Sequence, residues 1–273
     1  MLKSERTARI TRIHFNGELR ENSELNLPRD ASHHLITVLR TRQGDVIDLF
    51  NGDGLNYRAT VMDTGLRSSG KRALLQVHRS TAANTESPVD ITLVQGISRG
   101  DRMDTTLRQS VELGVTHLQP IHTRHSAPEL DERRRAKKVQ HWQSIVVSAS
   151  EQSGRAALAT LAPPISLKQW LSDVAVSGKA GPTRYVLAPT AEHSLRSGLD
   201  NCAKSASGRP AANSGKPGIV LIIGPESGLD ADEIEQVVHS GARAVSVGPR
   251  ILRTETAGPA CIALAQAILG DLG

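Results

Sequence analysis

The stretch IVLIIGPESGLDADEIE, Ile219–Glu235, decides how most of this chain folds. Its five apolar residues lead into Gly224-Pro225-Glu226-Ser227-Gly228, after which Asp230 and Glu233 have the spacing of a capping box that opens a helix. A strand, a glycine-containing loop and a capped helix together form the repeating unit of α/β sheets, whose ligands bind at the carboxyl ends of the strands. The loop is therefore a candidate binding site, although a tight structural turn explains its spacing equally well.

A second informative stretch is AVSVGPRILRTETAGPACIALAQAIL, Ala244–Leu269. A predicted strand ends at Gly248, and the loop that follows is rich in polar residues, namely Arg250, Arg253, Thr254 and Glu255. We expect a helix to begin near Thr256, with Pro259 in its first turn, where proline is tolerated. Because Ala260–Leu269 is apolar on nearly every side, this helix must be buried inside the protein or against a second copy of the chain.

Upstream of these stretches, apolar runs alternate with longer helical patterns, which predicts an α/β domain with a parallel sheet. Helices are expected over Asp101–Gly114 and Asp131–Gln152. The segment Asn201–Gly218 is rich in small and polar residues and is interpreted as a flexible surface loop. The predicted strands are Ile91–Ile97, His117–Ile121, Tyr185–Ala188, Ile219–Ile223 and Ala244–Val247.

The N-terminal part has a different pattern, and small polar residues over Ser80–Pro88 mark the change. We therefore expect an N-terminal domain over residues 1–80, a linker over 81–88 and the α/β domain over 89–273. A short helix is expected between Pro28 and Arg42. The remainder is predicted to be β-rich, with short strands at Asp45–Phe50, Tyr57–Met62 and Ala73–His78 separated by turn signals.

The amino-acid composition and net charge of the chain exclude some classes of function and favour others. Aromatic residues make up only 2% of the 273 residues, which argues against a platform of stacked rings for single-stranded nucleic acid. The net charge of +5 favours polyanionic partners. Two cysteines and the lack of a signal peptide or a long apolar segment predict a cytoplasmic protein that does not enter a membrane. Neither His33 with His34 nor His122 with His125 has the further ligands of a metal site, so no metal is expected.

Several motifs together resemble the RsmE family of SPOUT methyltransferases. GPESGLDADE and SVGPRILRTETA are similar to that family's paired cofactor loops. QGISRGDRMDTTLRQSVELGV, Gln95–Val115, resembles its first strand and helix, and SASEQSGR, Ser148–Arg155, resembles its EQSxR element. The β-rich module, with HHLITVLR and an NGDG turn, matches the family's PUA-like domain. One departure is Ser227, which stands where the family usually has glycine and adds a Cβ near the expected ligand path.

The resemblance implies a trefoil-knotted α/β sheet with helices on both faces, a small PUA-like barrel and an obligate homodimer. It also implies that S-adenosylmethionine is the cofactor and that N3 of a uridine in the 16S rRNA of the 30S ribosomal subunit is methylated. The expected cofactor residues are Leu187, Ala188, Pro189, Ile223, Gly224, Pro225, Glu226, Gly228, Gly248, Ile251, Leu252, Arg253, Thr254 and Thr256.

The N3 proton of uracil is only weakly acidic, so methylation requires a base or stabilisation of the anion by nearby cations. Arg253, Glu255 and Arg155 are the catalytic candidates, and Glu226 is an alternative proton acceptor. Two other functions remain open: methylation of another RNA such as tRNA, and RNA binding without catalysis. The arginines expected to contact RNA are Arg6, Arg9, Arg12, Arg20, Arg124 and Arg155.

Overall fold

The computed structural model describes residues 10–273 except 66–71, 128–130, 177–180 and 208–215. The chain divides into two compact units. The first contains the N-terminal residues through Glu86 together with Ser150–Leu158, and the second contains Ser87–Ala149 and Ala159–Gly273. The division differs from the contiguous domains expected, because nine residues from the middle of the chain cluster with the N-terminal unit.

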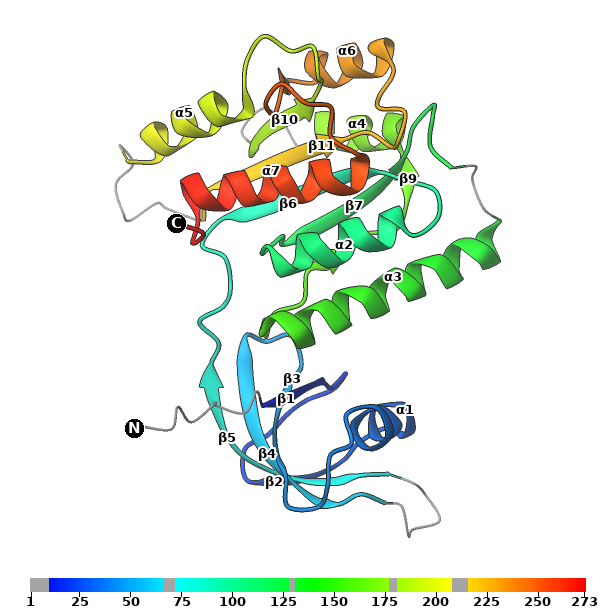
Figure 1. The fold of residues 1–273 in the computed structure, drawn as a ribbon, viewed down its shortest axis with the longest axis vertical. Coiled ribbons are helices and arrows are strands. Elements are labelled where there is room, and N and C mark those ends of the chain that lie inside the picture. The colour runs from blue at the N-terminus through cyan, green and yellow to red at the C-terminus, as the bar shows by residue number, and fades with distance from the viewer. Residues whose placement is uncertain (1–9, 66–71, 128–130, 177–180, 208–215) are drawn as a thin grey trace, which may run out of the picture. The chain divides into compact units, whose positions relative to one another are not determined.

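The second unit is built on a parallel sheet, as predicted (Figure 1). Its strand order is β12-β10-β11-β6-β7-β8, and β9 also pairs with β7. All five predicted strands are present, with small differences at their ends. The strands are β6 (Asp90–Gly96), β7 (His117–His122), β8 (Thr160–Leu161), β9 (Ile165–Ser166), β10 (Thr183–Leu187), β11 (Gly218–Ile223) and β12 (Arg243–Val245).

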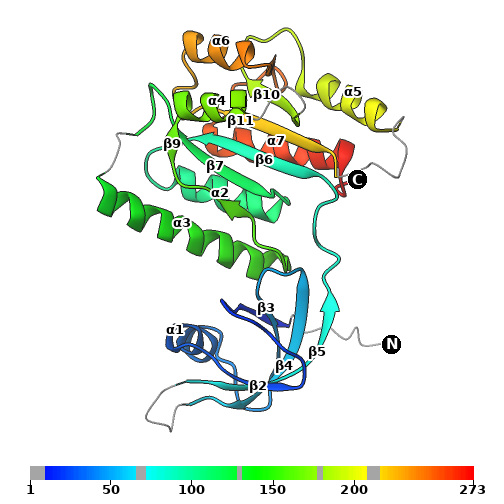
Figure 2. The same ribbon diagram turned by 180° about the vertical axis from the view of Figure 1, so that it is seen from behind.

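Helices cover both faces of this sheet. On one face α7 (Thr254–Leu269) packs against α2 (Arg102–Glu112) and α5 (Leu195–Ser207). This helix lies in front of the sheet in Figure 1 and behind it in Figure 2. On the other face, α4 (Leu167–Val176) and α6 (Ala231–His239) bury Trp170 and Val237 against strand residues such as Ile222. Because both faces are covered, the central strand β11 is apolar throughout its length, which is why it is recognisable in the sequence.

Two helical predictions need correction. Residues 201–207 belong to α5 and not to a flexible loop, because Leu195 and Leu199 form a fully buried pair one helical turn apart. Residues 208–215 of the predicted loop lie outside the described residues, and its last residue, Gly218, begins β11. The helix α7 begins at Thr254, two residues earlier than expected, so Pro259 lies in its second turn, where it is buried.

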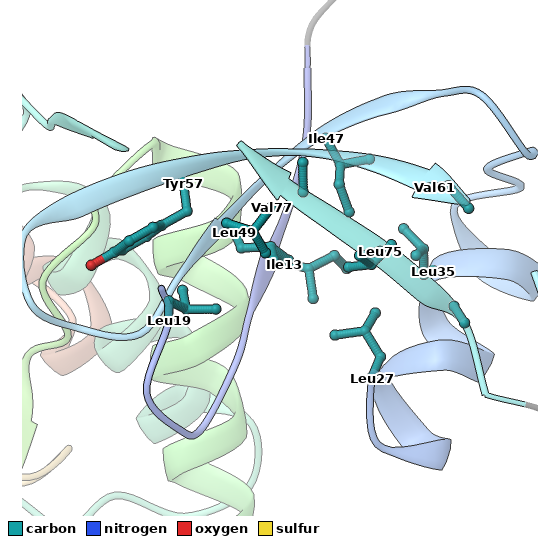
Figure 3. Packing of buried hydrophobic residues seen from close by; sticks show 12 residues of the cluster. Ile13, Leu19, Leu27, Leu35, Ile47, Leu49, Tyr57, Val61, Leu75 and Val77 are labelled. Atoms are coloured by element: carbon teal, nitrogen blue, oxygen red, sulfur yellow. The ribbon is translucent and has the colours of Figure 1, made fainter. Parts of the chain in front are cut away.

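The first unit is a five-stranded sheet with the order β1-β3-β4-β5-β2. Its core consists of residues such as Leu27, Leu35, Ile47 and Leu75 (Figure 3). The expected short helix is α1 (Arg29–His33), which continues as a π-helical turn, η1 (His34–Val38). The strands are β1 (Thr11–His14), β2 (Ser23–Asn26), β3 (Val46–Phe50), β4 (Leu55–Asp63) and β5 (Leu74–Ala82), of which the first two were not predicted.

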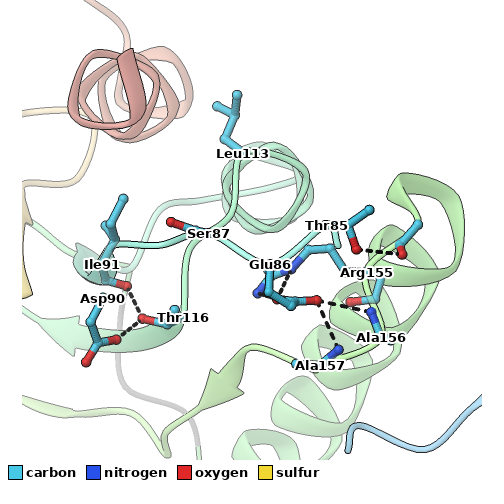
Figure 4. A network of polar contacts seen from close by, with 12 residues as sticks. Thr85, Glu86, Ser87, Asp90, Ile91, Leu113, Thr116, Arg155, Ala156 and Ala157 are labelled. Carbon is cyan, nitrogen blue, oxygen red and sulfur yellow. Dashed lines mark hydrogen bonds and ion pairs between the residues drawn. The ribbon is translucent and has the colours of Figure 1, made fainter. Parts of the chain in front are cut away.

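The segment 150–158, which contains the end of the helix α3 (Glu132–Ser153) and the residues after it, belongs to the first unit. Glu86 binds this segment (Figure 4). The Glu86 carboxylate accepts hydrogen bonds of 2.9 and 3.1 Å from the Arg155 guanidinium. It also accepts the backbone N–H groups of Ala156 and Ala157 at 3.1 and 3.0 Å. Only 4% of the Arg155 side chain is exposed. The prediction that Arg155 acts in catalysis and RNA binding is therefore corrected, because its guanidinium is buried in an internal ion pair.

No helix in the described part of the chain is both long enough and apolar enough to cross a membrane.

Replacing Glu86 should destabilise the protein strongly, because Glu86→Gln leaves the buried Arg155 guanidinium without its counter-charge. Breaking a buried ion pair in this way costs on the order of 3 kcal/mol. Urea unfolding followed by circular dichroism measures the loss. The matched control is Glu18→Gln, which breaks an exposed pair with Arg20 and should change stability little. Equal stability of the two variants would contradict a structural role for the Glu86–Arg155 pair.

Candidate active site

The candidate cofactor loops follow strands that end at the same level of the sheet. Leu187 of β10 pairs with Val245 of β12, and Ile223 of β11 pairs with Gln95 of β6. Because these strands are parallel, the loops that leave them emerge at one edge. The structure thus brings together the three predicted cofactor segments, which begin at Leu187, Ile223 and Gly248.

The loop after β11 is a tight turn that depends on glycine. The Gly228 N–H donates to the Pro225 carbonyl at 2.9 Å, and Gly228 has φ +76°. A Cβ on Gly224 would lie 2.6 Å from the Gly228 backbone, so only glycine fits there. Ser227 is exposed and is not among the described residues with positive φ, so the turn accepts a serine at this position without strain.

The helix α6 that follows this turn begins with the predicted capping box. The Asp230 side chain accepts the Asp232 N–H at 3.1 Å, and Glu233 Oε2 accepts the Asp230 N–H at 2.9 Å. These bonds satisfy N–H groups that the first helical turn leaves without partners. The glycine loop is therefore anchored by β11 on one side and by a capped helix on the other.

The loop after β12 lines a small pocket of about 120 Å³. Leu187, Pro189, Gly248, Ile251 and Leu252 were predicted as cofactor residues, and Val247, Pro249 and Arg250 complete the lining. Gly248 has φ +67°, and the space where a Cβ would project is open. Ile251 is 86% exposed, an unusual environment for a large apolar side chain. The pocket therefore offers apolar contacts and close backbone approach to a ligand.

A buried hydrogen-bond network fastens the two loops to each other. Thr254 Oγ1 donates to the Gly224 carbonyl at 2.8 Å. The Gln95 side chain reaches the same carbonyl at 3.2 Å and Thr254 Oγ1 at 3.0 Å through its Nε2. Gln95 is 1% exposed and was not predicted as a site residue. The available signal was an isolated amide near the end of the otherwise apolar stretch ITLVQGI.

The two candidate proton acceptors differ in their surroundings. Glu226 accepts the Arg99 N–H at 2.8 Å and pairs with Arg102 at 3.0 Å. Burial alone would raise the pKa of Glu226, but backbone N–H groups and the Arg102 guanidinium outweigh it and lower that pKa overall. Glu226 is therefore a carboxylate at neutral pH and a weak base, which suits a positioning role.

Glu255 lies in the first turn of α7 and has one carboxylate oxygen without a hydrogen bond among the described residues. Its Oε2 is buried and has no hydrogen-bond partner among the described residues. The nearest cation is Arg102, whose Nε lies 3.8 Å from Oε2, an ion-pair distance that is too long for a hydrogen bond. Of the two glutamates, Glu255 is therefore the one with a carboxylate oxygen that no described residue hydrogen-bonds.

The arginines predicted to contact RNA differ in how exposed they are and in what they bind. Arg12 is engaged internally, donating to Ser150 O at 2.9 Å and to Asn56 Oδ1 at 2.7 Å, which argues against its predicted role. Arg20 and Arg124 are exposed but form ion pairs with Glu18 and Asp230 respectively. Arg6 and Arg9 lie outside the described residues.

The structure also places other predicted side chains at this edge. Arg253 is the exposed N-cap residue of α7, and Arg250 is exposed in the preceding loop. Within the described ranges, no carboxylate pairs with either guanidinium. Thr256 is exposed on the first turn of α7. Among the residues that the structure covers, no three His, Cys, Asp or Glu side chains form a potential metal site.

Comparison with known proteins finds a matching family model for each of the two parts of the chain. A family model described as an RNA methyltransferase domain matches residues 85–266, and one described as an RNA methyltransferase PUA domain matches residues 27–67. A ribosomal RNA small subunit methyltransferase E from Synechocystis is 32% identical, over 87% of this chain and 71% of that protein. The Buchnera aphidicola (Acyrthosiphon pisum) protein of that name is 27% identical over 96% of this chain and 95% of its own length.

Two solved structures cover nearly the whole chain. A methyltransferase from Legionella pneumophila in complex with SAM has a TM-score of 0.83 and 32% identity, over 97% of this chain and 100% of that one. Ribosomal RNA small subunit methyltransferase E from Neisseria gonorrhoeae, bound to S-adenosyl methionine, has a TM-score of 0.79 and 33% identity with the same coverage. The chain therefore belongs to the RNA methyltransferase family that includes the ribosomal RNA small subunit methyltransferases E.

Proposed function

We propose that this chain transfers the methyl group of S-adenosylmethionine to N3 of a uridine in 16S ribosomal RNA. The observation that carries the proposal is the pair of loops at one sheet edge, fastened through the Gly224 carbonyl, in a chain of this family. Two structural neighbours that share about a third of its residues are bound to S-adenosylmethionine. The names of the relatives support small-subunit ribosomal RNA as the substrate, and the resemblance to the RsmE family supports N3 of a uridine as the methylated atom.

The residues at the two loops fit this cofactor. Leu187, Ile251 and Leu252 offer apolar surface in the pocket, and the glycines allow close backbone approach. The backbone of the turn from Gly224 to Gly228 offers polar groups at the neighbouring strand end. When bound, S-adenosylmethionine supplies a sulfonium methyl that is already electrophilic, so the protein chiefly orients the reactants and excludes water.

The remaining chemistry concerns the uracil. Glu255, whose buried Oε2 lies near Arg102 but has no hydrogen-bond partner among the described residues, accepts the N3 proton in this proposal. Arg253 and Arg250 are exposed beside the loops and stabilise negative charge on the uracil oxygens or on a phosphate. Arg102 holds Glu226 at 3.0 Å and lies 3.8 Å from Glu255, so it positions both carboxylates. Neither a catalytic role nor an RNA contact is assigned to Arg155.

The finer architecture expected for this family is also part of the proposal. We propose that the second unit forms a trefoil knot, that the first is a closed PUA-like barrel, and that the protein acts as a homodimer in the cytoplasm on the 30S subunit. In support of a dimer, α7 has side chains that the chain leaves incompletely buried on one face, namely Ala260, Ala263, Leu264 and Ala267. A partly buried apolar stripe of this kind is suited to a second copy.

The substrate class is tested by methyl transfer from labelled S-adenosylmethionine to RNA that lacks the modification. We expect transfer to 30S subunits to exceed transfer to naked 16S RNA, because a chain with few aromatic residues is better suited to a preformed RNA shape than to unstacked bases. Mapping should place the methyl group on N3 of one uridine. Preferred transfer to tRNA would contradict the proposed substrate, and binding of RNA without any transfer would contradict the enzymatic function.

The cofactor site is tested by Gly248→Ala, which places a methyl group in the open space beside the pocket. We expect affinity for S-adenosylmethionine to fall at least about tenfold, or roughly 1.4 kcal/mol, in calorimetric titration. The control is Gly44→Ala, since Gly44 also has positive φ and open space around it but lies in the first unit. It imposes a similar backbone strain. An equal loss of affinity in both variants would show that strain, and not the pocket, is responsible.

The proton acceptor is tested by Glu255→Gln, compared with Glu226→Gln. If Glu255 is the base, its amide variant should lower kcat about 100-fold at neutral pH. The defect should shrink as the pH rises, because hydroxide then removes the N3 proton. Glu226→Gln should mainly raise KM, since the lowered pKa of Glu226 makes it a weak base. A defect in Glu255→Gln that is constant across pH would indicate a positioning role only.

A further inference from the structure

A second, smaller pocket lies at the carboxyl ends of β6 and β7 and is used by none of the steps above. Its volume is about 80 Å³, well below the size of a typical small-molecule site. Ile97, Trp142 and Pro164 supply apolar wall, while His122, Arg135 and Lys138 supply polar groups. Two cations and no carboxylate contribute to its described lining, so the pocket favours an anion.

The helix α3 positions the two cations. Arg135, Lys138 and Trp142 are spaced by three and four residues, which places them along one helical face. The Lys138 ammonium lies 5.5 Å from the centroid of the Trp142 ring, within cation–π range. The indole Nε1 of Trp142 already donates to Asp104 Oδ1 at 3.2 Å, so this side chain acts as a wall and not as a ligand donor.

His122 provides an independent indication of a ligand. It is the last residue of β7, and its Nδ1 is buried without a hydrogen-bond partner in the described part of the chain. Buried polar atoms nearly always have a partner, so an orphaned atom on a residue that lines a cavity points to a hydrogen-bonding group that is missing nearby. As a lining residue, His122 can supply an imidazole N–H to an acceptor oxygen on the anion.

We propose that this pocket holds a phosphate group of the RNA backbone, an inference that rests on the proposed function. A phosphate carries the charge that two cations require and has several acceptor oxygens for Arg135, Lys138 and His122. A neutral base would leave both charges uncompensated. The pocket belongs to the same sheet edge as the cofactor loops, because β6 is the direct neighbour of β11. A phosphate held there fixes the register of the RNA without reading its sequence.

The basic run Arg133–Lys138 supplies a matched pair of variants. Arg135→Gln with Lys138→Gln removes the pocket cations, whereas Arg133→Gln with Lys137→Gln removes the same charge from exposed positions that do not line it. Binding of the methylatable RNA substrate is measured by fluorescence anisotropy over a series of salt concentrations. We expect the pocket variant to lose at least tenfold in affinity. The magnitude of its slope of log K against log salt should fall by about 0.7 to 0.9, the value for one lost phosphate contact.

The control variant should change RNA affinity less than threefold, and both variants should bind S-adenosylmethionine as the unmodified protein does. Equal losses of RNA affinity in the two variants, or no loss in either, would overturn the pocket assignment. If the unmodified protein methylates RNA and the pocket variant does so equally well, this inference fails while the proposed function stands. If the unmodified protein neither binds S-adenosylmethionine nor methylates RNA, the proposed function itself fails.

Free phosphate is distinguished from RNA by titrating inorganic phosphate into isotopically labelled protein and following the Trp142 indole N–H signal. Weak binding, with signal shifts only at millimolar phosphate that disappear in the pocket variant, supports the assignment to an RNA phosphate if that variant also loses RNA affinity. Tight, saturable binding of inorganic phosphate, with RNA affinity unchanged in the pocket variant, would assign the pocket to a free anion and overturn the proposal.

Discussion

The candidate site depends on one buried acceptor, the carbonyl oxygen of Gly224. Both Thr254 and Gln95 donate to it, and all three residues are buried. These residues come from three different strand–loop–helix units, so their bonds fix the relative positions of segments far apart in the sequence. A buried carbonyl without partners is costly, which makes the bonded arrangement strongly preferred. The two loops therefore form a preorganised edge before any ligand arrives.

This constraint connects the fold to the proposed chemistry. Since Thr254 is the first residue of α7, fastening it to Gly224 also sets where Glu255 and the N-cap Arg253 emerge. Arg102 adds a second connection by pairing with Glu226 in one loop and lying near Glu255 in the other. Glu255, Arg253 and the glycine turn are thus positioned by one network, and little reorganisation is required on binding.

The strands β6, β7, β10, β11 and β12 and the capped helix α6 were predictable because their signals are local. Buried parallel strands leave long apolar runs, and Asp230 with Glu233 forms a cap within four residues of sequence. The helix α5 was misjudged, because Leu195 and Leu199 are the only large apolar side chains that are buried among its described residues. Arg155 shows the limit most clearly. Its partner Glu86 is 69 residues away, and no local pattern reports that such a charge is buried.

The central claim is that the two fastened loops hold the methyl donor. The most direct test is a crystal structure of the protein with S-adenosylmethionine bound. The account predicts the donor in contact with the turn Gly224–Gly228 and with the pocket formed by Leu187, Gly248 and Leu252, while the bonds of Thr254 and Gln95 to Gly224 remain intact. A donor bound elsewhere, with these loops empty, would contradict it.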